Sequence, residues 1–341
     1  MQFTRLGQTD LRVTRTAFGA LPIQRLSIDE AVYLLRKAYS GGINFFDTAR
    51  GYTDSEEKIG LALSDVRDSV IIATKSHGKT GEEVRRDVLT SLEKLKTDYI
   101  DLFQFHNPDT IPRPGGADGR YETALELKDE GVIRHIGITN HRLAVAFEAV
   151  RSGLFETLQF PLSSLSSDKD LDLVRECAEL DAGFIAMKAL SGGLITNAAT
   201  SFAFLRSYEN VVPIWGIQRE SELNEFIALE SNPPELDAEM QELIEKDRRE
   251  LTGAFCRGCG YCLPCPEGIP INMAARLSLL VARAPYKRFL EQEWIDKMEL
   301  INNCTECGQC SSQCPYELDT PQLLKEEYGK YREFLAYHNA L

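Results

Sequence analysis

The stretch Ile43-Asn44-Phe45-Phe46-Asp47 is a short apolar run that ends in a carboxylate. It follows residues 28–40, where apolar side chains recur at helical spacing. Similar runs alternate with helix-like segments along the first two-thirds of the chain. Eight strands are predicted in this way, each followed by a helix or a helix-sized loop: residues 16–19, 43–46, 70–74, 100–105, 135–138, 157–160, 184–187 and 211–215.

Eight such repeats are typical of a (β/α)8 TIM barrel, because parallel strands that are buried on both faces read as continuous apolar runs. A doubly wound sheet is the competing fold, but its first strand would lead into a G-x-G-x-x-G turn. Phe18-Gly19-Ala20-Leu21-Pro22 does not supply that turn. Residues 3–13 are expected to form a hairpin that closes the bottom of the barrel. The predicted helices are residues 28–40, 82–95, 121–130, 143–152, 170–180 and 221–230.

Polar residues follow almost every predicted strand, at the end of a TIM barrel where chemistry takes place. Taken singly, Asp47 has an ordinary explanation as a helix N-cap, and His106 has one as a turn residue. Tyr52 follows the second strand by five residues, close enough to fold back over the mouth of the barrel. Together these residues indicate an active site, and those at the strand ends are Asp47, Lys75, His106, Thr139, Asn140, Gln159 and Lys188.

Residues 1–230 resemble the aldo-keto reductase family. The matching segments are Ile43-Asn44-Phe45-Phe46-Asp47-Thr48-Ala49, Gly51-Tyr52 with Ser55-Glu56, Ala73-Thr74-Lys75, Asp98-Tyr99-Ile100-Asp101-Leu102 leading to His106, and Ile133-Arg134-His135-Ile136-Gly137-Ile138-Thr139-Asn140. The resemblance implies an oxidoreductase whose catalytic tetrad falls on Asp47, Tyr52, Lys75 and His106.

Physical chemistry explains why these four side chains belong together. A tyrosine has an unperturbed pKa of about 10, too high for efficient proton transfer near neutrality. The Lys75 ammonium favours the tyrosinate and lowers the pKa of Tyr52, and Asp47 keeps the ammonium charged and in place. His106 donates a hydrogen bond to the substrate oxygen. A nicotinamide would then deliver hydride to a carbonyl carbon while Tyr52 protonates the oxygen.

The resemblance also implies how a nicotinamide cofactor binds. Thr139 and Asn140 match the family's pair on the carboxamide, and Arg219 is placed to contact a 2′-phosphate, which favours NADP over NAD. Three residues depart from the family pattern. Met187 replaces an aromatic residue that stacks on the nicotinamide, and Glu222 and Phe226 replace a Gln and an Asn near the adenine. The remaining candidate cofactor residues are Gln159, Lys188, Ser191, Gly193, Gly216 and Glu225.

Eight of the nine cysteines form two runs near the C-terminus. The second run matches the iron–sulfur pattern C-x2-C-x2-C-x3-C-P, and the first lacks one residue before its fourth cysteine. Two zinc sites would favour separated C-x2-C pairs, and disulfides would need an oxidising compartment. The ninth cysteine, Cys177, is expected to be an inert buried thiol. The runs are Cys256, Cys259, Cys262 and Cys265, then Cys304, Cys307, Cys310 and Cys314.

The long insert between the runs is similar to that of helical two-cluster ferredoxin domains. The similarity implies that the runs exchange their last ligands, with Cys314 completing the first cluster and Cys265 the second. The predicted organisation is a barrel (residues 1–232), a helical linker (233–253), a small, mainly helical domain with two [4Fe–4S] clusters (254–325) and a surface helix (326–341). Helices are expected over residues 272–284, 287–300 and 320–341.

The bulk composition of the 341-residue chain is ordinary for a globular protein, with 43% hydrophobic residues. A formal net charge of −14 argues against nucleic acid or an anionic membrane surface as a partner. No apolar stretch approaches the length that crosses a bilayer. Because a polar segment opens the chain and no secretory signal is recognisable, we expect a cytoplasmic protein.

The predicted barrel and the predicted cluster domain handle electrons differently, because a hydride carries two electrons whereas each cluster accepts one. The first hypothesis is an NADP-linked carbonyl reductase or alcohol dehydrogenase whose clusters transfer electrons, sense redox state or are structural. The second is an oxidoreductase that exchanges electrons with a ferredoxin-type partner through a flavin or a redox-active substrate. The third is a non-enzymatic, redox-sensing nucleotide-binding protein. The intact tetrad favours an enzyme acting on a small carbonyl or alcohol.

Overall fold

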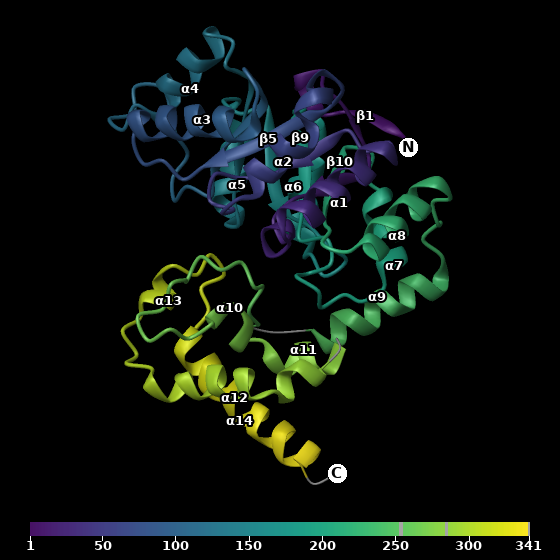
Figure 1. Ribbon diagram of the computed structural model, residues 1–341, viewed down its shortest axis with the longest axis vertical. Helices are drawn as coiled ribbons and strands as arrows, with labels where there is room; N and C mark the ends of the chain where they lie inside the picture. Colours follow the sequence, from purple (N-terminus) through teal and green to yellow (C-terminus); the bar gives the residue numbers. More distant parts are fainter. Residues whose placement is uncertain (252–254, 284–285, 340–341) are drawn as a thin grey trace. The chain divides into compact units, whose positions relative to one another are not determined.

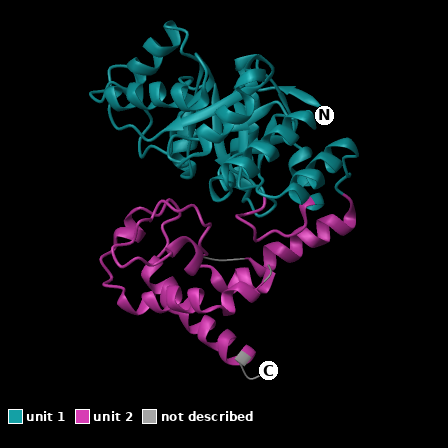
Figure 2. Cartoon of the chain, viewed as in Figure 1, with its two compact units in different colours: residues 1–189, 199–236 teal, residues 190–198, 237–341 magenta. Residues whose placement is uncertain are grey.

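The computed structural model describes residues 1–251, 255–283 and 286–339. The chain forms two compact units, one of Met1–Ala189 with Ala199–Leu236 and one of Leu190–Ala198 with Asp237–Leu341 (Figure 2). The domain boundaries given by the sequence remain predictions. The predicted junction between the helical linker and the iron–sulfur domain, at residues 253 and 254, lies outside the described residues. Residues 284, 340 and 341, where two predicted helices end, also lie outside them.

Within residues 1–251, eight parallel strands close into a barrel, which confirms the predicted fold (Figure 1). The last strand pairs with both its predecessor and the first, so the sheet has no free edge. The register places the ends of some neighbouring strands together; Gly19, which ends β3, lies opposite Asp47, and His106 lies opposite Thr139. In barrel order the strands are β3 (Ala17–Gly19), β4 (Phe45–Asp47), β5 (Ile71–Ser76), β6 (Ile100–His106), β7 (Ile133–Thr139), β8 (Thr157–Pro161), β9 (Gly183–Met187) and β10 (Val211–Gly216).

The N-terminal hairpin pairs β1 (Phe3–Arg5) with β2 (Arg12–Thr14) and closes the N-terminal end of the barrel, as predicted. Leu6 is buried in the same apolar cluster as Phe45 and Leu102 of the barrel strands. Gly7 has φ +54°, and a Cβ there would lie 2.1 Å from the backbone nitrogen of Gly183, so only glycine fits at this position.

The helices of the first unit are α1 (Ile28–Ser40), α2 (Ser55–Leu63), α3 (Gly81–Leu95), α4 (Arg120–Asp129), α5 (Leu143–Ser152), α6 (Asp168–Glu179), α7 (Ala198–Arg206, whose first residue belongs to the second unit) and α8 (Glu220–Ser231). The sequence predicts all of these except α2 and α7. In α7 almost every side chain is buried, so no amphipathic stripe marks the helix.

The second unit is mainly helical. Its helices are α9 (Ala238–Glu250), α10 (Ile271–Ala274), α11 (Leu277–Arg283), α12 (Gln292–Glu299), α13 (Gln309–Ser312) and α14 (Thr320–Asn339). The predicted helix over 272–284 is broken between α10 and α11, and the one over 287–300 is shortened to α12 by 3₁₀ turns at Lys287–Leu290 and Leu300–Asn303. Residues 255–270, which carry the first cysteine run, form no regular helix or strand, and short turns lie at residues 261–262 and 266–267.

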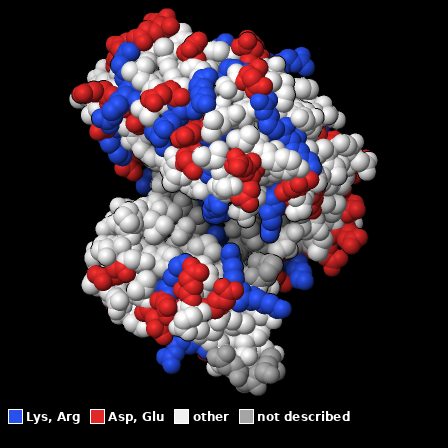
Figure 3. Space-filling view, in the orientation of Figure 1, with Lys and Arg blue, Asp and Glu red and all other residues white. Residues whose placement is uncertain are grey.

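Acidic and basic side chains of the described residues are interspersed on the visible face of each unit (Figure 3). The net charge of −14 therefore does not gather into one broad acidic patch on that face. No helix in the described part of the chain has both the length and the apolar character needed to cross a membrane.

Candidate active site and cluster sites

A buried ion pair occupies the ends of two neighbouring strands. Lys75 Nζ on β5 donates hydrogen bonds to Asp47 Oδ1 at 2.7 Å and to the carbonyl oxygen of Thr48 at 2.5 Å. Both charged side chains are at most 2% exposed. Burial raises the pKa of Asp47 and lowers the pKa of Lys75, and the attraction between the two opposes both shifts. The pair fixes the ammonium at the mouth of the barrel.

Tyr52 and His106 lie next to this pair. Lys75 Nζ is 5.2 Å from the centroid of the Tyr52 ring, and the Tyr52 and His106 rings meet edge to face at 5.9 Å. Tyr52 comes from the turn after β4 and is partly exposed, whereas His106 ends β6 and is buried. The structure thus brings together the four side chains that the sequence groups as a tetrad.

A second histidine, His77, stacks on His106 with ring centroids 3.8 Å apart and an interplanar angle of 13°. Burial, together with the charges of His77, Lys75 and His141, holds the pKa of His106 well below its usual value. His106 is therefore neutral near pH 7 and has one ring N–H to donate. His77 was not predicted as a site residue, although its position two residues after Lys75 places the two side chains on the same side of an extended chain.

Amide side chains extend the buried polar network. Gln104 Nε2 lies 3.0 Å from Gln159 Oε1 and 3.4 Å from Asp47 Oδ2. The predicted cofactor residue Gln159 therefore lies beside the tetrad carboxylate, where it also lowers the pKa of Asp47 against the dominant effect of burial. Gln104 was not predicted; it sits two residues before His106 on β6 and so shares its face of the strand.

Thr139 and Asn140 position the loop that follows β6. The hydroxyl of Thr139 accepts a hydrogen bond from the backbone of Asn107, and the Asn140 amide donates to the carbonyl of Pro108 at 2.8 Å. The neighbouring His141 is buried, and this burial keeps its pKa well below the usual value. His141 was not predicted as a site residue either. It follows Asn140 at the end of a strand, and nothing in the sequence distinguishes it from any other histidine in such a place.

The remaining candidate cofactor residues follow β9 and β10. Lys188, Ser191 and Gly193 all have positive φ, so the chain after β9 turns through left-handed backbone. Ser191 and Gly193 belong to the second compact unit, whereas Lys188 belongs to the first. Gly216 ends β10 and is exposed, as is Glu225 on α8.

Arg219 is held by its neighbour Glu222. The Arg219 Nε donates to Glu222 Oε1 at 2.9 Å, and the same carboxylate accepts the backbone N–H groups of Gln218 and Arg219 at the start of α8. Phe226, the other departure in this region, is buried and stacks on Trp215 at 4.2 Å. Glu222 therefore competes for the one side chain predicted to recognise a 2′-phosphate.

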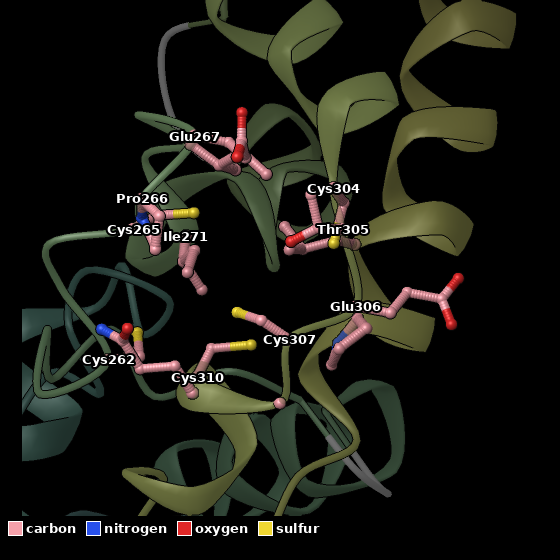
Figure 4. A pocket seen from close by; sticks show the side chains of 15 residues that line it. Cys262, Cys265, Pro266, Glu267, Ile271, Cys304, Thr305, Glu306, Cys307 and Cys310 are labelled. Atoms are coloured by element: carbon pink, nitrogen blue, oxygen red, sulfur yellow. The ribbon is translucent and has the colours of Figure 1, made fainter.

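Cysteines from both runs line each of two cavities in the second unit. Figure 4 shows the sulfur atoms of Cys265, Cys304, Cys307 and Cys310 around one of these cavities, which Cys262 also borders. The other cavity is lined by Cys256, Cys259, Cys262 and Cys314. These are the two groupings that the exchange of last ligands requires.

The surroundings of these thiols suit iron–sulfur clusters. Burial raises the pKa of Cys262 to about 12 and also raises that of Cys256, so a bound cation is needed to keep them as thiolates. The backbone N–H of Gly258 donates to Cys256 Sγ at 3.3 Å, and hydrogen bonds to sulfur are one of the means by which proteins tune clusters. Cys177 is buried on α6 with its pKa raised to about 12, as expected of an inert thiol.

Comparisons with known proteins agree with both halves of this description. The sequence profile of the aldo/keto reductase family matches residues 16–207, and that of a 4Fe-4S dicluster domain matches residues 255–319. The chain is 32% identical to an uncharacterised oxidoreductase of Bacillus subtilis over 58% of its own length and 67% of the relative's. It is 31% identical to the L-galactose dehydrogenase of Arabidopsis thaliana, with the same two coverages.

The barrel is similar to the crystal structure of an aldo-keto reductase from Pseudomonas aeruginosa. The TM-score is 0.60 at 26% sequence identity, and the alignment covers 67% of this chain and 94% of that one. The profile match, the relatives and the barrel agree with one another, and the dicluster match favours iron–sulfur clusters over zinc. The chain is an oxidoreductase that belongs to the aldo/keto reductase family and carries a 4Fe-4S dicluster domain after its barrel.

Proposed function

We propose that the barrel transfers hydride between NADP(H) and a small carbonyl or alcohol substrate, and that two [4Fe–4S] clusters carry electrons or sense redox state. The observation that carries the proposal is the buried Lys75–Asp47 pair beneath the ring of Tyr52, with His106 edge-on to the same ring. A charged lysine under a tyrosine at the mouth of a barrel is an arrangement for moving a proton near neutral pH.

In the reducing direction, the Tyr52 hydroxyl donates its proton to the carbonyl oxygen. The Lys75 ammonium stabilises the tyrosinate that remains, and Asp47 keeps that ammonium in position. Neutral His106 donates an N–H to the same oxygen and orients the carbonyl for attack. A bound NADPH supplies the hydride. Thr139, Asn140 and Gln159 are the residues proposed to contact the nicotinamide. Residues Leu190–Leu194 of the loop after β9, together with Arg219, are proposed to contact the phosphates of the cofactor.

The relatives support the substrate class. The Arabidopsis relative is an L-galactose dehydrogenase by name, and a dehydrogenase of this kind interconverts an alcohol and a carbonyl. This chain spans about two thirds of the length of that relative, so the substrate itself is not carried over. We extend only the alcohol–carbonyl chemistry to this protein.

An electron-transfer role with a ferredoxin-type partner is the second candidate function. The observation in its favour is that Cys307, which lines the same cavity as Cys265, is exposed. A cluster bound there would lie near the surface, where a partner protein exchanges electrons. In this case a flavin or a redox-active substrate would have to connect two-electron and one-electron chemistry.

Anaerobic addition of NADPH to cluster-replete protein tests the proposal. We expect NADPH oxidation that depends on an added small aldehyde such as methylglyoxal. The broad sulfur-to-iron absorption is followed in the same cuvette. Bleaching by NADPH alone would favour the electron-transfer function. Constant absorption during turnover would indicate that the clusters take no part in the reaction of the barrel. No turnover with any carbonyl or alcohol tested, in protein that binds NADPH, would contradict hydride transfer.

Replacing Glu222 by glutamine should strengthen NADPH binding by roughly 1.4- to fivefold, because an exposed ion pair is worth about 0.2–1 kcal/mol. Glutamine still accepts the backbone N–H groups at the start of α8, but it frees the Arg219 guanidinium. The measurement is the Kd for NADPH and for NADH by fluorescence titration. Glu220→Gln is the matched control, since Glu220 pairs with Lys37 instead. Equal changes for NADPH and NADH would contradict the 2′-phosphate role.

A further inference from the structure

The loop that follows β9 is part of the compact unit that holds the cysteines. Residues Leu190–Ala198 cluster with Asp237–Leu341, although the chain enters them directly from a barrel strand (Figure 2, magenta). This is also the loop that we propose to contact the cofactor phosphates. Two arginines bind its backbone: Arg276 Nη1 donates to the carbonyl of Gly192, and Arg283 Nη1 donates to the carbonyl of Leu194, each at 3.1 Å.

Arg276 differs from Arg283 in what else it contacts. Its guanidinium is packed between two glycines, because a Cβ added to Gly192 would lie 2.6 Å from Nη1 and one added to Gly258 would lie 2.5 Å from Cζ. Gly258 is the residue whose backbone N–H donates to Cys256 Sγ. Arg276 therefore contacts both the loop after β9 and the turn that carries the first cysteine run.

The position of this charge is fixed. Arg276 is 6% exposed, and its Nε donates to the carbonyl of Asn272 in α10 at 3.0 Å. Its charge also acts on Cys256, where it opposes the rise that burial causes in the pKa of that thiol. Arg283 instead pairs with Asp247 and Glu250 of α9. Thus only Arg276 of these two arginines links the loop to the turn that carries the first cysteine run.

We propose that Arg276 couples the oxidation state of the cluster bound by the first cysteine run to nucleotide binding at the Leu190–Ala198 loop. The inference rests on the proposed function, which assigns the nucleotide and the cluster to these two sites. A reduced cluster carries one more negative charge, which attracts the guanidinium at the expense of the Gly192 carbonyl and repels nucleotide phosphates. Reduction therefore weakens nucleotide binding, and by linkage the bound nucleotide lowers the reduction potential of that cluster.

The test uses the full chain with both clusters loaded and a redox-inert probe, 2′-phosphoadenosine diphosphoribose, which has the phosphates of NADP but no nicotinamide. Its Kd is measured by anaerobic calorimetry with the clusters oxidised and after reduction with dithionite, which supplies the electrons. We expect roughly five- to tenfold weaker binding to the reduced protein, within the usual range of coupling between sites. A tenfold ratio corresponds to a potential lowered by about 59 mV for one electron, which an EPR-monitored redox titration detects.

Arg276→Gln should bring the ratio of the two Kd values close to one while the iron content stays that of the wild type. Arg283→Gln removes the other arginine that donates to the backbone of this loop, but it should keep the ratio. If the glutamine variant loses iron, Arg276→Lys takes its place, because lysine retains the positive charge. In this variant the ratio of the two Kd values should fall only part of the way towards one. A wild-type ratio of one, or an unchanged ratio in Arg276→Gln, would overturn the coupling alone. Absence of probe binding in both states would overturn the coupling and the NADP(H) assignment together.

Discussion

Replacement of Tyr52 by phenylalanine is expected to lower kcat for carbonyl reduction by about 10²- to 10⁴-fold, the usual contribution of a positioned general acid. The substitution removes only the hydroxyl, so the ring still packs over Lys75 and against His106. Steady-state kinetics with NADPH and a small aldehyde would measure the loss. Nucleotide affinity and iron content should remain those of the wild type.

Tyr99→Phe is the matched control for this variant. Its hydroxyl hydrogen-bonds Asp68, and its ring lies against Arg67 and Arg134, away from the tetrad. It should therefore retain wild-type turnover. If Tyr52→Phe kept full activity, Tyr52 would not be the proton donor, and the assignment of the whole tetrad would have to be abandoned.

Cys265→Ser should remove the cluster bound by the second cysteine run and leave the cluster of the first run intact. The reason is geometric: Cys265 faces the cavity of Cys304, Cys307 and Cys310 (Figure 4). Iron content should fall from about eight to about four atoms per chain, the content of one [4Fe–4S] cluster. Cys314→Ser should remove the other cluster, because Cys314 lines the cavity of Cys256 and its neighbours. Iron analysis and the EPR spectrum of the remaining reduced cluster would identify which one is lost.

Cys177→Ala is the control for the cysteine variants, since Cys177 is buried in α6 of the barrel unit. Its iron content should equal that of the wild type. Loss of the first run's cluster in Cys265→Ser, with the second run's cluster retained, would refute the exchange of last ligands. The two runs would then each supply all four ligands of one cluster.

The barrel could be predicted from sequence because its strands are buried on both faces and its strand ends are polar. Every predicted strand coincides with an observed one to within a few residues, as 43–46 does with Phe45–Asp47. The tetrad residues could be grouped because parallel strands place their last residues at one end of the barrel, where the tetrad lies. The cysteine runs could also be predicted to bind iron–sulfur clusters, because the spacing of the cysteines is set by the cluster that they surround.

Other features depend on tertiary contacts that no local pattern records. Helix α2 was missed because its polar residues are buried: Glu56 accepts hydrogen bonds from Thr74 and Ser91, each at 2.6 Å, and pairs with Arg50. A carboxylate satisfied in this way reads as a surface charge in the sequence. The packing of the Leu190–Ala198 loop with the cysteine-bearing unit was likewise invisible, since it depends on Arg276, more than eighty residues further along the chain.

The sharing of both cavities between the two cysteine runs has a consequence for biosynthesis. Under the proposed ligand sets, the first run lacks its fourth ligand until Cys314 has been made, and Cys265 has no partners until Cys304–Cys310 follow. Neither cluster can therefore be completed on a nascent chain that still lacks its C-terminal run. The barrel has by then been synthesised in full, so cluster insertion is a late step that follows synthesis of the catalytic half.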